Sequence, residues 1–228
     1  MNVVVGSAFR NSDGNVGRYM KQVAALGHLN PSDGIRVVAV EGDSTDRTWN
    51  ILDNVAIKQY LDVQRVKCEH GGPVFGSVET PERFAALSKV GNAIFDSVLE
   101  DDDVLLYVES DLVWDAPTAS TLITRALART GGFDVLAPLV MAGECLYDIW
   151  AFRKLDGERF SPFTVPAFLS PNGSTFEVSS VGSCLAMRGE VARRCRIRND
   201  LCLVGWCEDA RANGYKIGVC PDLIVRHP

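Results

Sequence analysis

Residues 103–111 have the sequence DVLLYVESD, an apolar run that ends in two carboxylates one residue apart. Side chains alternate along a β-strand, so Glu109 and Asp111 are expected to point the same way at the carboxyl end of this strand. Such oxygen ligands suit Mg²⁺ or Mn²⁺, which proteins hold with one or two carboxylates together with the phosphates of a substrate. An isolated acid-x-acid triplet is more often a solvated acidic turn. Other segments of the chain are therefore needed to distinguish a metal site from such a turn.

The composition is typical of a well-packed globular protein. The chain has 228 residues, of which 46% are hydrophobic, enough for one large α/β domain. No apolar run reaches the length of a membrane span. The first seven residues, MNVVVGS, lack the basic region and long apolar stretch of a signal peptide. We therefore expect a cytoplasmic protein.

The net charge bears on the class of protein, and the cysteine pattern bears on the state of its thiols. The formal net charge of −6 argues against a protein that coats nucleic acid. The arginines between Arg188 and Arg198 are interpreted as a solvated helix face. The seven cysteines include no CxxC pair and lie mostly in apolar surroundings, which predicts buried, reduced thiols.

Apolar strands alternate with amphipathic helices over the first 138 residues. We predict strands at 3–7, 35–40, 61–66, 103–109 and 133–138, and helices at 19–29, 44–59, 81–100 and 117–129, with a glycine-rich loop at 11–17. Shorter, mixed strands are expected at 147–152, 176–181 and 184–187. This order predicts an α/β fold with a Rossmann-like, mostly parallel sheet flanked by helices, whose ligands bind at the carboxyl ends of the strands.

Five segments of the chain follow one another in an order that carries a resemblance. They are VEGDSTDRT at 40–48, RFAALSKVGN at 83–92, ESD at 109–111, the acidic segment GWCED…NGYKI at 205–217, and VRH at 225–227. In this order they resemble the V-D-D-G-S-T-D-x-T segment, the helix before the metal motif, the D-x-D motif, the G-x-x-E-D…G-x-x-I segment and the terminal strand of nucleotide-sugar glycosyltransferases with the GT-A fold. The resemblance implies one domain over residues 1–228, in which 1–115 bind the nucleotide sugar and 116–228 bind the acceptor.

The resemblance also implies roles for individual residues. The metal, Mn²⁺ or Mg²⁺, would be bound by Asp111, Glu109 and His227. Asp209, supported by Glu208, would be the catalytic base that takes the proton from the acceptor hydroxyl. From the residues alone, this acidic pair can also be the N-terminus of a helix, predicted at 208–213, where acids favour the helix dipole. The donor would be bound by Ser7, Phe9, Arg10, Glu41, Asp43, Lys89, Asn92, Glu109 and Ser110.

A second resemblance concerns the acceptor side. Residues 147–153, YDIWAFR, are similar to the Y-D-x-W-x-x-R-D segment of capsule and cell-wall α-mannosyltransferases, although Lys154 stands where those enzymes carry the final Asp. Those enzymes retain the anomeric configuration, so inverting and retaining mechanisms both stay open. The loops at 70–73 and 171–174 are candidate lids. The acceptor would be bound by Tyr147, Asp148, Trp150, Arg153 and Trp206.

The implied activity is transfer of a hexose from a UDP- or GDP-sugar to a hydroxyl of a glycan, a lipid carrier or a small molecule. A hydroxymethylated DNA base is a further conceivable acceptor, against which the negative charge argues. A sugar-nucleotide nucleotidyltransferase is an alternative, but such enzymes open with a glycine-rich basic loop, and GSAFR at 6–10 has too few glycines. A catalytically silent nucleotide- or glycan-binding module is the alternative from another class.

Overall fold

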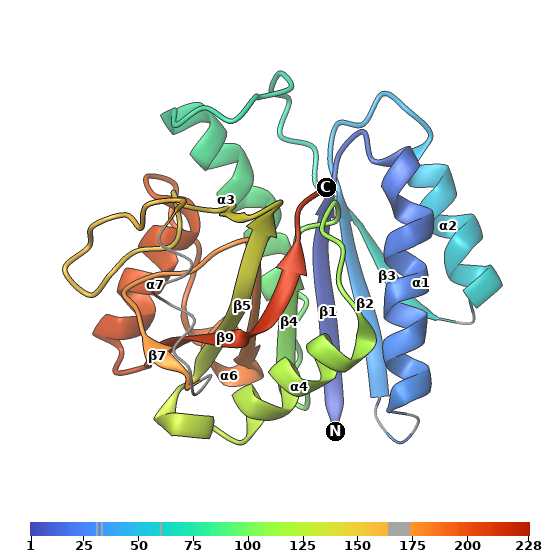
Figure 1. Ribbon diagram of the computed structural model, residues 1–228. Coiled ribbons are helices and arrows are strands. Elements are labelled where there is room, and N and C mark those ends of the chain that lie inside the picture. The colour runs from blue at the N-terminus through green and yellow to red at the C-terminus, as the bar shows by residue number, and fades with distance from the viewer. Residues whose placement is uncertain (31, 33, 60, 164–173) are drawn as a thin grey trace.

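The computed structural model describes residues 1–30, 32, 34–59, 61–163 and 174–228, with backbone only at 55–59. Its centre is a nine-stranded mixed sheet with the strand order β3-β2-β1-β4-β8-β5-β9-β7, and β6 pairs with β5 outside this path. Helices cover both faces of the sheet (Figure 1). The predicted α/β fold with a mostly parallel, helix-flanked sheet is confirmed.

The first half of the chain alternates strands and helices as predicted. Its four strands are parallel: β1 (Asn2–Phe9), β2 (Gly34–Glu41), β3 (Asp62–Lys67) and β4 (Val104–Val108). Three helices connect them: α1 (Asp13–Leu29), α2 (Thr48–Gln59) and α3 (Pro81–Asp96). Because these strands are parallel, their carboxyl ends meet at one edge of the sheet.

The second half adds mixed strands to the same sheet. Its elements in chain order are α4 (Ala116–Leu127), η1 (Thr130–Gly132), β5 (Val135–Ala142), β6 (Cys145–Leu146), β7 (Phe176–Glu177), β8 (Cys184–Arg188), α6 (Gly189–Arg194), α7 (Cys202–Ala212) and β9 (Ile217–Arg226). β8 is antiparallel to both β4 and β5, whereas β9 is parallel to β5. β9 therefore ends at the same edge as β1 and β4, and Figure 1 shows the C-terminus beside the end of β1.

Side-chain alternation divides the core between the two faces. Val4 of β1 belongs to the cluster that packs against α3, α6 and α7, whereas Val3 and Val5 belong to the cluster under α1 and α4. Gly6 allows α3 to approach β1 closely, because a Cβ at this position would lie 2.3 Å from Ile94 Cγ2. All seven cysteines are free and six of them are buried, as predicted. Among the described residues, no helix combines the length and apolar character needed to cross a membrane.

The beginnings of two helices differ from the predictions. The predicted loop at 11–17 is helical from Asp13 onward, and the backbone N–H of Asp13 donates to Asp46 Oδ2 at 3.0 Å. The second helix begins at Thr48, later than predicted. Ser44 and Thr45 instead bind Asn11, whose Oδ1 accepts from the backbone N–H of Thr45 at 2.8 Å.

Two segments of the second half also differ from the predictions. The predicted strand at 147–152 forms turns, because the side chain of Asp148 accepts from the N–H of Ala151 and closes the backbone on itself. The helix predicted at 208–213 begins six residues earlier, at Cys202. Its first two turns are buried in the core, so this apolar stretch supports the helix by packing.

Candidate functional site

A cleft of about 550 Å³ opens at the carboxyl ends of β1 and β4, and we call it the outer cleft. One wall is the strap, defined as residues 70–80 between β3 and α3. The strap contributes His70 and residues 74–77 to the lining. Six of the predicted site residues line this cleft: Phe9, Arg10, Glu109, Ser110, Asp111 and Tyr147.

A smaller cavity of about 260 Å³ adjoins the outer cleft, and we call it the inner cavity. The two share Arg83, Glu109 and Tyr147 among their lining residues. The inner cavity is also lined by Asp148 and Trp150, which were predicted to bind the acceptor. The structure therefore brings the predicted acceptor segment next to the predicted donor loops.

Asp111 and His227 come from opposite ends of the sequence and meet beside the outer cleft. His227 Nε2 lies 3.4 Å from Asp111 Oδ2. The backbone bonds that place them run between neighbouring residues: the N–H of Val113 donates to Arg226 O at 2.8 Å, and the N–H of Arg226 donates to Val113 O at 2.9 Å. The strand β9 thus carries His227 to the acid-x-acid turn, as the resemblance implied.

This pair fits one side of a divalent metal site. Asp111 Oδ1 is buried and has no hydrogen-bond partner, although a carboxylate oxygen is a strong acceptor. Among the described residues, however, no three His, Cys, Asp or Glu side chains surround one metal position. The donor set is one carboxylate and one imidazole, so a bound Mn²⁺ or Mg²⁺ would need further ligands from phosphate or water.

Glu109 and Asp148 form a half-buried acidic pair at the junction of the two cavities. Burial, with Asp148 and Asp111 nearby, raises the pKa of Glu109 to about 8. Burial also raises the pKa of Asp148, although its Oδ2 accepts from Ser183 Oγ at 2.6 Å and its Oδ1 accepts from the N–H of Ala151 at 3.1 Å. Such perturbed acids in a cavity are typical of functional sites.

The acids of segment 40–48 bind the protein itself. Glu41 is fully buried, and its carboxylate accepts from the N–H of Ser44 at 2.9 Å and pairs with Lys67 Nζ at 2.6 Å. Asp43 Oδ2 accepts from the backbone N–H groups of His70 and Gly71, at 2.9 and 3.1 Å. Both residues were predicted to contact the donor; in this structure they instead fix the loop around the cleft.

Three other predicted donor residues do not line either cavity. Ser7 is fully buried, and its hydroxyl bonds to Tyr19 and Val108 O. Lys89 Nζ donates to Glu69 O at 2.6 Å. Asn92 exchanges two hydrogen bonds of 2.9 Å with the backbone of Ile197. These contacts occupy the side chains of Ser7 and Asn92 and one donor of Lys89, so the structure does not bring these three residues into either cavity.

The predicted catalytic pair lies outside both cavities. Glu208 and Asp209 are on the exposed side of α7, where Glu208 Oε2 lies 3.0 Å and Asp209 Oδ1 lies 3.6 Å from Arg198 Nη1. Other arginines of the basic run are paired in the same way, Arg193 with Glu100 and Arg196 with Asp96. The run is therefore a solvated, charge-balanced surface, and the acidic pair is not placed as a base in this arrangement.

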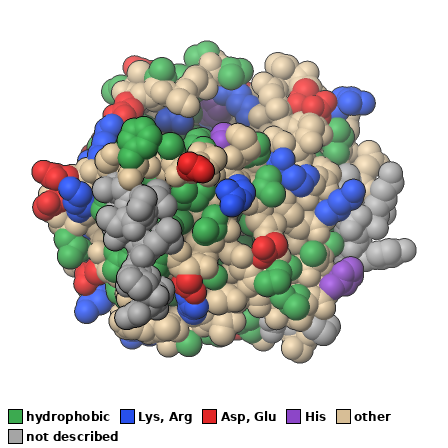
Figure 2. All heavy atoms as spheres, viewed as in Figure 1, with side chains coloured by type: hydrophobic (Ala, Val, Ile, Leu, Met, Phe, Trp, Pro, Cys, Tyr) green, Lys and Arg blue, Asp and Glu red, His purple; other side chains and the backbone are tan. Residues whose placement is uncertain are grey.

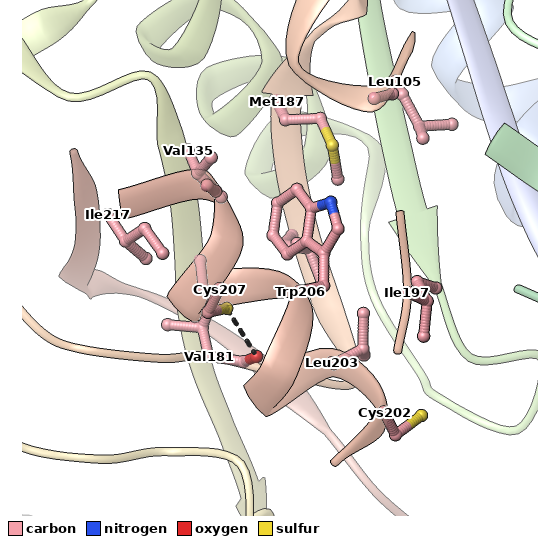
Figure 3. Packing of buried hydrophobic residues seen from close by; sticks show 14 of the residues in the cluster. Leu105, Val135, Val181, Met187, Ile197, Cys202, Leu203, Trp206, Cys207 and Ile217 are labelled. Carbon is pink, nitrogen blue, oxygen red and sulfur yellow. Dashed lines mark hydrogen bonds between the residues drawn. The ribbon is translucent and has the colours of Figure 1, made fainter. Parts of the chain in front are cut away.

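Trp206 is not available to an acceptor in this structure. Its side chain is fully buried, and Figure 3 shows it enclosed by Leu105, Met187, Ile197 and Leu203. This corrects the prediction that it stacks on a sugar: a helix that begins at Cys202 turns Trp206 toward the sheet, where it packs edge-on against Phe95, 5.7 Å between ring centroids.

Trp150 and Arg153 lie together at the acceptor side. The ring of Trp150 packs on Phe84 with centroids 5.0 Å apart, and the guanidinium of Arg153 lies 5.6 Å from the Trp150 ring centroid. Trp150 lines the inner cavity, whereas Arg153 supports it from behind and donates from Nε to Trp150 O. Arg153 therefore helps to hold Trp150 in place.

The strap is held at both ends. Arg10 Nη1 and Nη2 donate to Pro73 O and Gly72 O, both at 2.8 Å. At the other end, Glu79 Oε2 accepts from Arg159 Nη2 at 2.8 Å and is hydrogen-bonded to the side chain of Trp150. The candidate lid at 70–73 is part of this strap, and the candidate lid at 171–174 lies, apart from its last residue, outside the described residues.

Arg83, Ser183 and the strap beyond residue 73 were not predicted from the sequence as parts of the site. Arg83 lines both cavities, and Ser183 binds Asp148 from an irregular residue with φ = 61° just before β8. The signal for Arg83 was its place in the first turn of a well-capped helix, opposite the acid-x-acid strand. A basic residue on a helix is by default a surface charge, so this signal is weak without coordinates.

Solved structures with similar folds match the chain over nearly its whole length. The mannosyltransferase PcManGT from Pyrobaculum calidifontis, in complex with GDP-Man and Mn²⁺, has a TM-score of 0.67 and 12% identity; the match covers 98% of this chain and 56% of that one. S. aureus TarS 1–349 in complex with UDP-GlcNAc has a TM-score of 0.60 and 15% identity, with coverages of 99% and 58%. Glucosyl-3-phosphoglycerate synthase from Mycobacterium tuberculosis, with Mn²⁺, UDP and its product, has a TM-score of 0.52 and 15% identity, with coverages of 99% and 68%.

At these identities, the matches establish the fold of the chain. The chain spans less than two thirds of the length of TarS 1–349 and PcManGT. A scan of protein-family models and a search of curated protein sequences each find no match.

Proposed function

We propose that this chain, which has the GT-A fold of nucleotide-sugar glycosyltransferases, transfers a hexosyl group from a nucleotide-diphosphate sugar to an acceptor hydroxyl. The observation that carries the proposal is the junction of two cavities beside the Asp111–His227 pair. One cavity is large enough for a nucleotide, and the other opens from it. TarS with UDP-GlcNAc and PcManGT with GDP-Man support a nucleotide sugar without choosing between the bases.

The two cavities bind different parts of the nucleotide sugar. The nucleoside occupies the outer cleft between Phe9, Asn11 and the strap, and the sugar ring extends into the inner cavity. There the indole of Trp150 offers an apolar surface to a sugar ring, and Ser183 and Glu109 offer hydrogen bonds to its hydroxyls. The outer cleft draws mainly on residues 1–115 and the inner cavity draws largely on later ones, but the two-half division of the domain stays a prediction.

Asp111 and His227 would hold the Mn²⁺ or Mg²⁺ ion. When bound, the ion neutralises the negative charge of the diphosphate leaving group. Asp111 is the ligand best prepared for this role, because Oδ1 is buried without a partner. Glu109 lies two residues earlier and points into both cavities, so it is placed to bind the sugar rather than to complete a ring of ligands.

The proton of the acceptor hydroxyl passes to a carboxylate of the inner cavity. Asp148 is the better candidate, because Ser183 Oγ and the N–H of Ala151 hold it in one orientation. Glu109 is the second carboxylate that lines this cavity. If the enzyme retains the anomeric configuration, the same side chains would orient the acceptor rather than deprotonate it.

The acceptor is a glycan, a lipid carrier or a small molecule. A DNA acceptor is disfavoured, because the arginines of the 188–198 run are paired with acids and would not form a phosphate track. On the face seen in Figure 2, acidic and basic side chains are interspersed. The cytoplasmic location stays a prediction.

The test is release of nucleoside diphosphate from a panel of UDP- and GDP-sugars, with Mn²⁺, Mg²⁺ or EDTA. We expect one donor to be hydrolysed slowly in the presence of metal, and Asp111→Ala to abolish this. Asp62→Ala removes an exposed carboxylate at the start of β3, away from the cleft, and is the matched control. Pyrophosphate release from a nucleoside triphosphate and a sugar 1-phosphate would replace the proposal with a nucleotidyltransferase. Tight nucleotide binding without hydrolysis or transfer to any acceptor would favour a binding module.

A further inference from the structure

Arg83 lies where the outer cleft meets the inner cavity and lines both. It belongs to the first turn of α3, where Thr80 caps the helix by accepting from the N–H of Arg83 at 3.4 Å. Pro81 at the start of the helix stiffens the same turn. The backbone that carries the guanidinium is therefore well fixed, and the side chain is half-buried.

The guanidinium of Arg83 has donors to spare. Among the described residues it donates one hydrogen bond, from Nη1 to Val78 O at 3.3 Å, and it has no carboxylate within ion-pair distance. Arginine carries five N–H donors in a planar fork. Most of the donors of Arg83 are thus left for a ligand in the cavities that it lines.

Other basic side chains around the outer cleft are already engaged. Arg10 donates to the strap, Arg18 Nη2 donates to Asp111 O at 2.6 Å, and Lys89 donates to Glu69 O. Lys67 pairs with Glu41. Arg10 and Lys89 were predicted from the sequence to bind the donor, and both donate to backbone carbonyls. Arg18 and Lys89 each donate one hydrogen bond, as Arg83 does, but neither lines the outer cleft or the inner cavity. Of the basic residues named here, Arg10 and Arg83 line the outer cleft, and Arg83 also lines the inner cavity.

We propose that Arg83 binds the diphosphate of the nucleotide sugar and stabilises the charge that develops on it as the glycosidic bond breaks. The proposal rests on the function proposed above. A nucleoside diphosphate leaves with more negative charge than a divalent ion neutralises, and Asp111 and His227 supply few ligands for such an ion. Arginine matches two phosphate oxygens with its fork, and a contact that strengthens as charge builds up accelerates the reaction.

The position of the acids agrees with this role. Arg83 acts electrostatically on both Glu109 and Asp148 but forms an ion pair with neither. An arginine whose purpose was to neutralise a buried carboxylate would be expected to bind it directly, as Arg129 Nε binds the buried Asp134 Oδ1 at 2.8 Å. Arg83 is instead a cation held near the acids, with its donors left for an incoming anion.

The test compares three probes that differ only in phosphate: a nucleoside, its monophosphate and its diphosphate. Calorimetric titration with Mn²⁺ is expected to show that Arg83→Gln weakens diphosphate binding by about 30-fold, as for the loss of a charge-assisted pair. The monophosphate should be affected less and the nucleoside hardly at all. Arg83→Lys keeps the charge but not the planar fork, so its diphosphate affinity should lie between those of the unmodified protein and Arg83→Gln. Arg211→Gln, an exposed residue of α7, is the control for charge alone.

A second titration in EDTA separates Arg83 from the metal. Direct phosphate contact predicts that Arg83→Gln still weakens diphosphate binding there, whereas Asp111→Ala loses its effect. An equal loss for all three probes, or no loss for the diphosphate, would overturn the role of Arg83 while leaving the proposed function intact. If Arg83→Gln does not fold, as judged by thermal unfolding, unchanged diphosphate affinity in Arg83→Lys would overturn the bidentate contact. If the unmodified protein binds no nucleotide at all, the proposed function fails and the inference falls with it.

Discussion

The imidazole ring of His227 stacks on the phenol ring of Tyr147, with ring centroids 3.9 Å apart and an interplanar angle of 15°. The backbone N–H of His227 also donates to Met141 O at 2.8 Å. These contacts direct Nε2 toward Asp111 and orient a residue that would otherwise be free to rotate. Contacts that hold a side chain in one orientation tune its affinity for a metal ion.

Replacing Tyr147 should therefore weaken metal binding without removing a metal ligand. Tyr147→Leu removes the stacking surface, and we expect the Mn²⁺ concentration for half-maximal nucleotide binding to rise about tenfold. Tyr147→Phe keeps the ring and should behave like the unmodified protein. Titration of Mn²⁺ at fixed nucleoside diphosphate measures both. Equal effects of the two substitutions would show that the hydroxyl of Tyr147, not its ring, matters.

The second prediction concerns which carboxylate takes the proton from the acceptor hydroxyl. Asp148→Asn should lower turnover by about 100-fold or more, because it removes a carboxylate of the inner cavity while the contact with Ser183 can persist. Asp209→Asn is the matched control and should leave turnover close to that of the unmodified protein, because Asp209 faces Arg198 on the surface. Steady-state rates, measured with an acceptor that supports transfer, show which of the two substitutions lowers turnover. The reverse result would support the sequence-based assignment of Asp209 and require α7 to move when substrates bind.

The fold was predictable because three of the parallel strands contain apolar runs: VVV at 3–5 in β1, VVAV at 37–40 in β2 and VLLYV at 104–108 in β4. The strands predicted at 3–7 and 35–40 correspond to β1 and β2, with differences of one or two residues at the ends. The start of α1 was not predictable in this way. Gly14 and Gly17 are typical of loops, and the contact of Asp46 with Asp13 crosses 33 residues of sequence. Local propensity cannot include a contact that exists only after the sheet has formed.

The candidate site was predictable in its residue types but not in its partners. The sequence places acids at 41, 109, 111, 148 and 209, yet it does not show that Lys67 binds Glu41 or that Arg198 binds Asp209. Those ion pairs decide which acids face a cavity. Arg83 illustrates the converse, because its importance depends on free donors and on two cavities that only the folded chain creates.

The third prediction concerns the strap. Glu79 joins the strap to the acceptor side through Arg159, so Glu79→Ala should release that end and accelerate amide hydrogen exchange across residues 74–79. Global stability should change by less than about 1 kcal/mol, because both partners of the pair are largely exposed. Glu158→Ala breaks a comparable surface pair with Lys154 and is the control. Unchanged exchange in Glu79→Ala would indicate that Arg10 alone holds the strap.

The last prediction concerns Glu41 and acid stability. Burial by itself would raise the pKa of Glu41, but Lys67 and Ser44 hold the pKa below its ordinary value. The ionised side chain therefore stabilises the folded protein above the ordinary glutamate pKa of about 4.3, and this contribution is lost as the pH falls through the lower, folded-state pKa. Glu41→Gln should lower the free energy of unfolding by about 2 kcal/mol at pH 7, and the difference should shrink below about pH 4. Urea unfolding at several pH values, with the exposed Glu177→Gln as control, measures this. A difference that does not vary with pH would mean that Glu41 contributes by its shape and hydrogen bonds rather than by its charge.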